Sequence, residues 1–141
     1  MTPNRGGLSF LFVYGSLMQG LRDDLLQKVR AKFVGAGTIQ AKLYDLGRYP
    51  GAKPSTKTAE RVRGEVHRLA DPEAALEILD RYEEYFRGAP GKSQFVRQVV
   101  RVTLDDGGQQ QAWAYFYNRP VDESRLIPSG DYRVIVAATR R

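Results

Sequence analysis

Apolar and polar positions along this chain follow two periods, one of two residues and one of about 3.6 residues. Residues 9–14 carry apolar side chains on both alternating faces, which predicts a central strand buried on both sides. Alternation over residues 61–69 predicts a half-buried strand, with Val62 and Val66 inward and His67 on the exposed face. Residues 33–46 also read as extended.

Two segments have the helical period. Four apolar residues between Leu21 and Val29 predict a short helix of about ten residues. Asp71 followed by proline and an acidic residue is typical of a helix start, and this second helix is expected to continue to about Glu84. Glycines and prolines make residues 49–57 and 87–92 predicted loops.

The C-terminal part of the chain completes the set of predicted elements. Residues 95–104 and 110–117 flank an Asp-Asp-Gly-Gly turn and predict a β-hairpin. Residues 132–138 are compatible with a last strand or a helical turn. About six strands and two helices without regular βαβ alternation indicate an α+β fold with a mixed or partly closed sheet. The length of 141 residues fits one domain over residues 1–141.

Composition excludes several chemistries. The chain has no cysteine and one histidine, so disulfides, thiol nucleophiles and cysteine or histidine metal sites are not expected. No EF-hand loop or aspartate cluster is present, and we expect neither a metal nor a cofactor. Catalysis in this chain would depend on carboxylates, hydroxyls and backbone dipoles.

Charge and hydropathy indicate which partners and which cellular location to expect. The net charge is +6, but basic residues are scattered among acidic ones without a basic run, so we expect no nucleic-acid partner. The longest apolar run near the N-terminus, residues 8–14, is too short for a membrane span or a signal peptide. The expected location is therefore cytoplasmic, without membrane association.

The first candidate site is the turn that follows the buried strand of residues 9–14. Tyr14-Gly15-Ser16-Leu17 lets the chain turn sharply, so that successive backbone N–H groups can point into one concavity. Such a nest binds a carboxylate or an oxyanion without any side chain. A purely structural turn is the alternative interpretation.

The second candidate is Glu83, near the end of the predicted second helix. At about 100° per residue it lies about 20° from Leu76 and 40° from Leu79, on the apolar face. Its neighbour Glu84 shares the polar face with Asp80. One carboxylate is therefore expected to point inward and the next one outward.

An inward carboxylate at a helix C-terminus is expected to have a raised pKa. Burial disfavours its charge, and so does the negative end of the helix dipole. A raised pKa suits a general acid or base that works near neutral pH. The alternative is that Glu83 lies at the rim of the face and pairs with a basic residue such as Arg87.

The remaining candidates have weaker signals. Ser16 has no histidine–aspartate relay evident in the sequence, so nucleophilic serine chemistry is not expected. Trp113, Tyr115 and Tyr117 share one strand face and are expected to be core. A phenol on that face can also donate a hydrogen bond into a pocket.

The order of these motifs resembles the γ-glutamylcyclotransferase (AIG2-like) family from about residue 9 to residue 132. The resemblance is carried by six short segments, which are YGSL at residues 14–17, VRGEV at 62–66, LDRYE at 79–83, FVR at 95–97, AWAY at 112–115 and SGDY at 129–132. Each motif is short, but six in this order are specific.

The resemblance implies a small, mixed, mostly antiparallel β-barrel flanked by helices, which releases 5-oxoproline from a γ-glutamyl amine or peptide. In such families the YGSL backbone binds the γ-glutamyl group, the glutamate at the position of Glu83 is the general base, and Tyr115 matches a pocket tyrosine. Many relatives have glycine where this chain has Glu84, and some have tyrosine in place of Phe95. The alternative is a module that binds a small anionic metabolite without turning it over.

The leaving group is expected to face the two predicted loops. The resemblance thus yields one catalytic residue, Glu83, and a substrate-binding set of Tyr14, Gly15, Ser16, Leu17 and Tyr115.

Overall fold

The computed structural model describes residues 8–15, 17–18 and 20–139. In this part of the chain the strands are β1 (Phe10–Val13), β2 (Ala31–Asp45), β3 (Pro50–Pro54), β4 (Arg61–Leu69), β5 (Phe95–Leu104) and β6 (Gln109–Tyr117). The α-helices are α1 (Asp23–Lys28), α2 (Pro72–Tyr82) and α3 (Tyr132–Thr139), with single 3₁₀ turns at η2 (Pro90–Lys92) and η3 (Glu123–Arg125).

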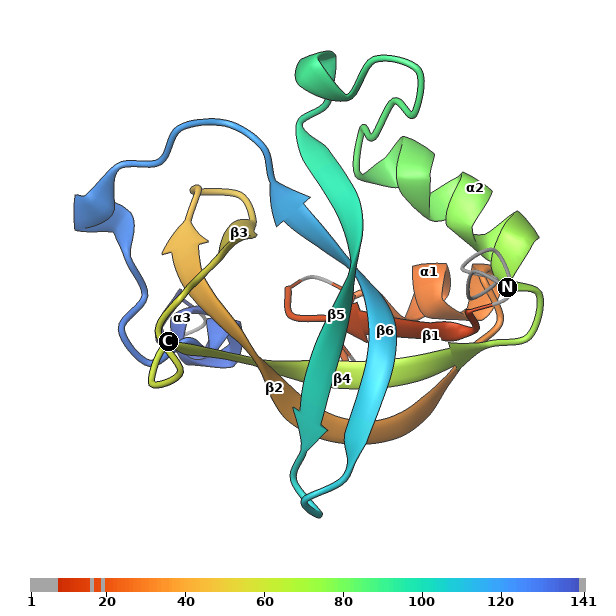
Figure 1. Cartoon of the computed structure of the whole chain (residues 1–141), viewed down its shortest axis with the longest axis horizontal. Helices are drawn as coiled ribbons and strands as arrows, with labels where there is room; N and C mark the ends of the chain where they lie inside the picture. Colours follow the sequence, from red (N-terminus) through yellow and green to blue (C-terminus); the bar gives the residue numbers. More distant parts are fainter. Residues whose placement is uncertain (1–7, 16, 19, 140–141) are drawn as a thin grey trace.

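The strands form a closed, mixed β-barrel (Figure 1). The strand order is β3-β2-β4-β1-β6-β5, and a further antiparallel pairing of β2 with β5 closes five of the strands into a ring. β1 and β6 are parallel, and the other pairs are antiparallel. The predicted α+β class and its mostly antiparallel barrel with flanking helices are confirmed, and the C-terminal segment is a helix.

Alternating side chains of the barrel strands build two cores. One fills the barrel interior with aromatic, branched and small side chains, among them Phe12, Ile39, Val62, Val102 and Ala114. The other lies outside β1 and β6 and is covered by α1 and α2, with Leu11, Trp113, Leu25, Leu76 and Leu79 among its members. Figure 1 shows α1 and α2 together beside β1, with α3 on the other side of the view.

Local sequence signals place several elements where they were predicted. The Asp71 side chain accepts a hydrogen bond from the Ala74 N–H at 3.3 Å and caps α2, with proline at the first helical position. β5 and β6 pair in register from Phe95 opposite Tyr117 onward. A register shift between Phe33 and Gly35 marks a β-bulge or irregularity in β2, within the segment predicted to be extended.

The prediction of a loop over residues 49–57 is wrong for the first half of this segment. Residues 50–54 form β3, which pairs antiparallel with β2 through Leu43 opposite Ala52. β3 is an edge strand, where proline is tolerated because one side of the strand needs no N–H donor. The two prolines mark the ends of this strand.

The prediction that His67 is exposed is also wrong, since only 1% of its surface is accessible. Its Nε2 lies 3.0 Å from the Glu65 carboxylate, which also accepts from Arg133 of α3 at 3.0 Å. The Phe33 ring of β2 packs edge-on against the imidazole at 5.7 Å. Side chains of β2 and α3 thus cover a face of β4 that its polar residues predicted to be exposed to solvent.

None of the helices in residues 8–15, 17–18 and 20–139 is long and apolar enough to cross a membrane.

Candidate active site

A cavity of about 210 Å³ lies where the end of β1 approaches the C-terminal end of α2. It is lined mainly by aromatic and acidic residues from β1 and its following turn, β3, α2, β5 and β6. These residues are Phe12, Val13, Tyr14, Gly15, Leu17, Tyr49, Pro50, Tyr82, Glu83, Glu84, Gln94, Phe95 and Tyr115. Glu83 and the turn after the first strand, which are far apart in sequence, therefore share one cavity.

Glu83 is the C-cap of α2, and its N–H donates to the carbonyl of Leu79 at 2.8 Å. The residue is half-buried, with its carboxyl in the cavity wall, and burial raises the pKa of this carboxyl to about 8. The alternative pairing with Arg87 is not formed, because the guanidinium of Arg87 pairs with Asp80 at 3.1 Å. Glu83 is thus placed to exchange a proton near neutral pH.

The turn after β1 lies against the start of β3. The Met18 N–H donates to the Gly15 carbonyl at 3.0 Å and closes the turn. A Cβ at position 15 would lie 2.8 Å from Cγ of Pro50, so only glycine fits this approach. Leu17 is buried in the cavity wall, whereas Ser16 lies outside the described residues.

The Tyr14 hydroxyl ties three strands together. It donates to the Tyr115 carbonyl of β6 at 2.6 Å and accepts from the Ala52 N–H of β3 at 3.1 Å. Burial, and the nearby Glu83 carboxylate, raise the pKa of this phenol far above its ordinary range. Tyr14 therefore contributes its ring to the cavity, while its hydroxyl holds β3 and β6 in place.

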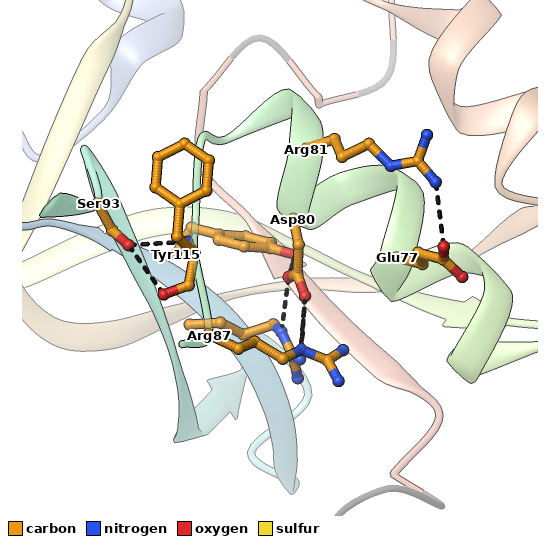
Figure 2. Close-up of polar contacts among 8 residues, drawn as sticks. Glu77, Asp80, Arg81, Arg87, Ser93 and Tyr115 are labelled. Carbon is orange, nitrogen blue, oxygen red and sulfur yellow. Dashed lines mark hydrogen bonds and ion pairs between the residues drawn. The ribbon is translucent and has the colours of Figure 1, made fainter. Parts of the chain in front are cut away.

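Asp80 was predicted to lie on the polar, outward face of α2, but it is buried. It lies at the centre of the polar contacts drawn in Figure 2. Its carboxylate accepts from the Tyr115 hydroxyl at 2.6 Å and from Nε of Arg97 at 2.9 Å. Arg87 closes the cluster from the exposed side. The Tyr115 phenol thus donates to the protein itself, and its pKa is raised by burial and by the Asp80 carboxylate.

Arg97 is held by aromatic rings as well as by Asp80. Its guanidinium lies 4.3 Å from the centre of the Trp113 ring and 5.8 Å from that of Tyr85. The register of the predicted hairpin, as the structure has it, places Arg97 opposite Tyr115. A cation on this buried face needs a counter-charge, and that was the available signal for Asp80.

The end of α2 fixes Glu84 in a left-handed conformation with φ of 54°. The Tyr85 N–H donates to the Asp80 carbonyl at 2.8 Å and the Glu84 N–H to the Arg81 carbonyl at 3.2 Å. This pair of bonds is a Schellman motif, which usually has glycine at the position of Glu84. Glu84 therefore holds a backbone conformation that is strained for a residue with a Cβ atom.

Replacing Glu84 by Gly is expected to raise the free energy of unfolding by about 1 kcal/mol, because glycine adopts this conformation without the steric cost. Urea unfolding of the two proteins measures the difference. Gly88, which lies in the following loop with open space around it, offers a control, since Gly88→Ala relieves no such strain. A clear loss of stability in Glu84→Gly would contradict the expectation.

The outer wall of the cavity comes from β3 and β5. Phe95 packs against Tyr49 at 5.9 Å and against Tyr117 at 5.4 Å, and Gln94 is hydrogen-bonded to the Tyr49 hydroxyl. Of residues 49–57, which were expected to face the leaving group, Tyr49 and Pro50 line the cavity. Residues 87–92 were expected to contribute as well, but no described residue of this segment lines the cavity.

Comparison with known proteins agrees with this architecture. The profile of the family "Gamma-glutamyl cyclotransferase, AIG2-like" matches residues 11–134. The chain is 37% identical over 123 residues, 86% of its length, to the γ-glutamylcyclotransferase family protein YtfP of Escherichia coli K12, of which it covers 94%. The chain belongs to the γ-glutamyl cyclotransferase, AIG2-like family.

Two further relatives bear on substrate and fold. The chain is 32% identical over 110 residues to the γ-L-glutamyl-butirosin B γ-glutamyl cyclotransferase of Niallia circulans, with 77% of this chain and 67% of that protein covered. The crystal structure of an AIG2-like protein from Mus musculus superposes with a TM-score of 0.66 at 20% identity, covering 88% of this chain and 87% of that one. The second comparison concerns the fold alone.

Proposed function

We propose that this protein is a γ-glutamylcyclotransferase that releases 5-oxoproline from a γ-glutamyl amine or peptide, with Glu83 as the general acid and base. The observation that carries the proposal is the shared cavity, which is lined both by the half-buried residue Glu83 and by residues of the turn after β1. Family membership supports the γ-glutamyl substrate class. A relative whose name states that activity on γ-L-glutamyl-butirosin B supports it too.

The reaction needs a proton acceptor more than it needs a nucleophile from the protein. The substrate's own α-amine attacks its γ-carbonyl carbon, so that a new N–C bond closes a five-membered lactam and the bond to the leaving amine breaks. Glu83 accepts one proton from the α-ammonium before the attack, and the attacking nitrogen loses a second proton as the lactam forms. Glu83 passes these protons to the departing amine, which leaves as an ammonium ion. The tethered nucleophile replaces a second reactant, provided the substrate chain is held folded.

The cavity walls supply that positioning. The backbone amides of the turn at Gly15–Leu17 are the donors proposed to hold a negative group of the substrate, either its α-carboxylate or the developing oxyanion. The rings of Tyr14 and Tyr115 form an apolar wall whose hydroxyls are already engaged within the protein. A wall that does not rearrange keeps the substrate close to its attacking conformation.

The pH dependence of the reaction should reveal the raised pKa of Glu83. The base must be ionised in the free enzyme, so kcat/KM is expected to rise with pH through an apparent pKa of about 8. A glutamate of ordinary pKa would already be ionised at pH 6 and would give a flat profile. Initial rates of 5-oxoproline release from pH 5.5 to 9 distinguish the two cases.

The activity itself is tested by incubating the protein with γ-glutamyl amines, γ-glutamyl dipeptides and glutathione, and measuring 5-oxoproline. Release from at least one class, absent without protein, supports the proposal. Saturable binding of these compounds without any 5-oxoproline would instead identify a binding module that uses the same cavity, and would reject the enzymatic assignment.

A further inference from the structure

The cavity carries acidic side chains and no basic one. Glu83 and Glu84 both line it, and among its described lining residues there is no lysine, arginine or histidine. Arg97 and Arg87 do not line the cavity, and they share the Asp80 carboxylate as their partner. Because burial raises the pKa of Glu83 to about 8, the negative charge of the described lining at pH 7 comes chiefly from the Glu84 carboxylate, next to the electron-rich faces of aromatic rings.

Arg22 is a basic residue that contacts Tyr82, one of the lining residues. Its guanidinium pairs with Asp24 at 3.0 Å and lies 5.5 Å from the centre of the Tyr82 ring. It therefore approaches Tyr82, a lining residue, but brings its own counter-charge. The Arg22–Asp24 pair therefore does not neutralise the Glu84 carboxylate.

Glu84 occupies the mouth of the cavity, because it lines the cavity and is itself exposed. The Schellman motif fixes its backbone, and the Gln94 N–H donates to its carbonyl at 3.2 Å. Within the described part of the chain, no ion pair or side-chain hydrogen bond engages the Glu84 carboxylate. An uncompensated negative charge thus stands at the entrance of the cavity, on a backbone that is held in place.

The cavity size decides which part of a substrate meets that charge. A volume of about 210 Å³ is below the range of about 300–1,000 Å³ typical of pockets for drug-sized ligands. It suits a γ-glutamyl group with its reacting carbonyl at Glu83. The leaving amine then extends to the mouth, beside Glu84 and the half-exposed ring of Tyr82.

We infer that Glu84 is a specificity-determining residue that selects γ-glutamyl amines whose leaving amine carries a second, cationic group, and that disfavours leaving groups with a carboxylate. The inference rests on the proposed function, because it concerns the leaving group of that reaction. A distal ammonium is attracted by the Glu84 carboxylate and by the Tyr82 ring, whereas a carboxylate is repelled by Glu84. Glutathione, which ends in a carboxylate, is then a poor substrate.

Three substrates of nearly equal length isolate the charge. They are the γ-glutamyl conjugates of 1,3-diaminopropane, propylamine and β-alanine, whose leaving groups end in an ammonium, a methyl group and a carboxylate. For the wild-type protein we expect kcat/KM for 5-oxoproline release to fall in that order, by about five- to tenfold between the first and the last, as befits exposed charges. The difference is expected to shrink as salt is added.

The Glu84→Gln variant tests the residue, since it keeps the side-chain length and removes the charge. The ratio of kcat/KM between the cationic and the anionic conjugate is expected to fall to about one. Glu73→Gln is the matched control, because Glu73 is an exposed acid in the first turn of the same helix, and there the ratio should stay as in the wild type.

The outcomes separate the two proposals. Turnover of all three conjugates at equal efficiency, or a preference for the cationic conjugate that survives in Glu84→Gln, overturns the role of Glu84 and leaves the cyclotransferase activity standing. No 5-oxoproline from any conjugate overturns the proposed function and, with it, this inference. A charge-dependent ratio that Glu84→Gln abolishes and Glu73→Gln keeps supports both.

Discussion

The Glu83→Gln variant is expected to release 5-oxoproline about 10²- to 10⁴-fold more slowly than the wild type, which is the usual contribution of a general acid or base. Glutamine keeps the size of the side chain and can still form hydrogen bonds, but it cannot accept the proton of the α-ammonium. Steady-state rates at pH 8 on one γ-glutamyl substrate measure the effect. Binding of the substrate, measured by calorimetry, should largely persist.

Stability measurements show whether such a loss comes from unfolding. Because the folded protein raises the pKa of Glu83 from about 4.5 to about 8, the folded state holds this proton more tightly than the unfolded chain does. Stability therefore falls as pH rises between these two values, and Glu83→Gln removes that loss. The variant should be at least as stable as the wild type, by a margin that grows from pH 5 to pH 8. Unchanged turnover in a folded variant would reject Glu83 as the base.

Asp80→Asn is expected to have the largest effect on stability, a loss of about 3–5 kcal/mol in the free energy of unfolding. The substitution keeps the shape but removes the charge that compensates Arg97, whose side chain is only 8% exposed. It also weakens the acceptor of the buried Tyr115 hydroxyl. Urea unfolding at pH 7 measures the change.

Glu77→Gln is the matched control for Asp80→Asn. Glu77 lies one turn earlier on the same helix and pairs with Arg81 at 3.0 Å, with both side chains exposed (Figure 2). An exposed pair of this spacing contributes about 0.2–0.5 kcal/mol. Equal losses in the two variants would show that burial of Asp80 is not what makes its charge important.

The helix period was sufficient to place Glu83, because the apolar positions Leu76 and Leu79 define the face that packs on the barrel. The backbone reversal at Gly15 was also predictable, since a buried strand must end where it meets glycine and polar residues. Both of these residues line the cavity.

Asp80 and His67 show where such patterns fail. A single helix or strand reveals which of its faces is apolar, but not whether a polar face meets other polar groups. Asp80 of α2 is buried because Arg97 of β5 and Tyr115 of β6 approach it with a charge and a hydroxyl. His67 is buried through Glu65, which an arginine of the last helix reaches. These contacts link segments that are far apart in sequence.

The edge strand β3 was missed for a related reason. Proline and glycine in residues 50–54 argue against a strand when they are considered locally. The pairing with β2 and the Tyr14 hydroxyl, which accepts the Ala52 N–H, supply what the local sequence lacks. Tertiary hydrogen bonds here outweigh propensity.

The close approach of Gly15 to Pro50 has a consequence for how this binding site can diversify. With 2.8 Å available to a Cβ, position 15 can gain no side chain unless β3 moves, and β3 is anchored by Tyr14. The turn at Gly15 and strand β3 can therefore change only together. We expect this side of the cavity, proposed to hold the γ-glutamyl group, to tolerate few substitutions. Substitutions are less constrained at Tyr82 and Glu84, which line the cavity and are exposed to solvent. New ligand preferences in descendants of this chain should therefore arise there first.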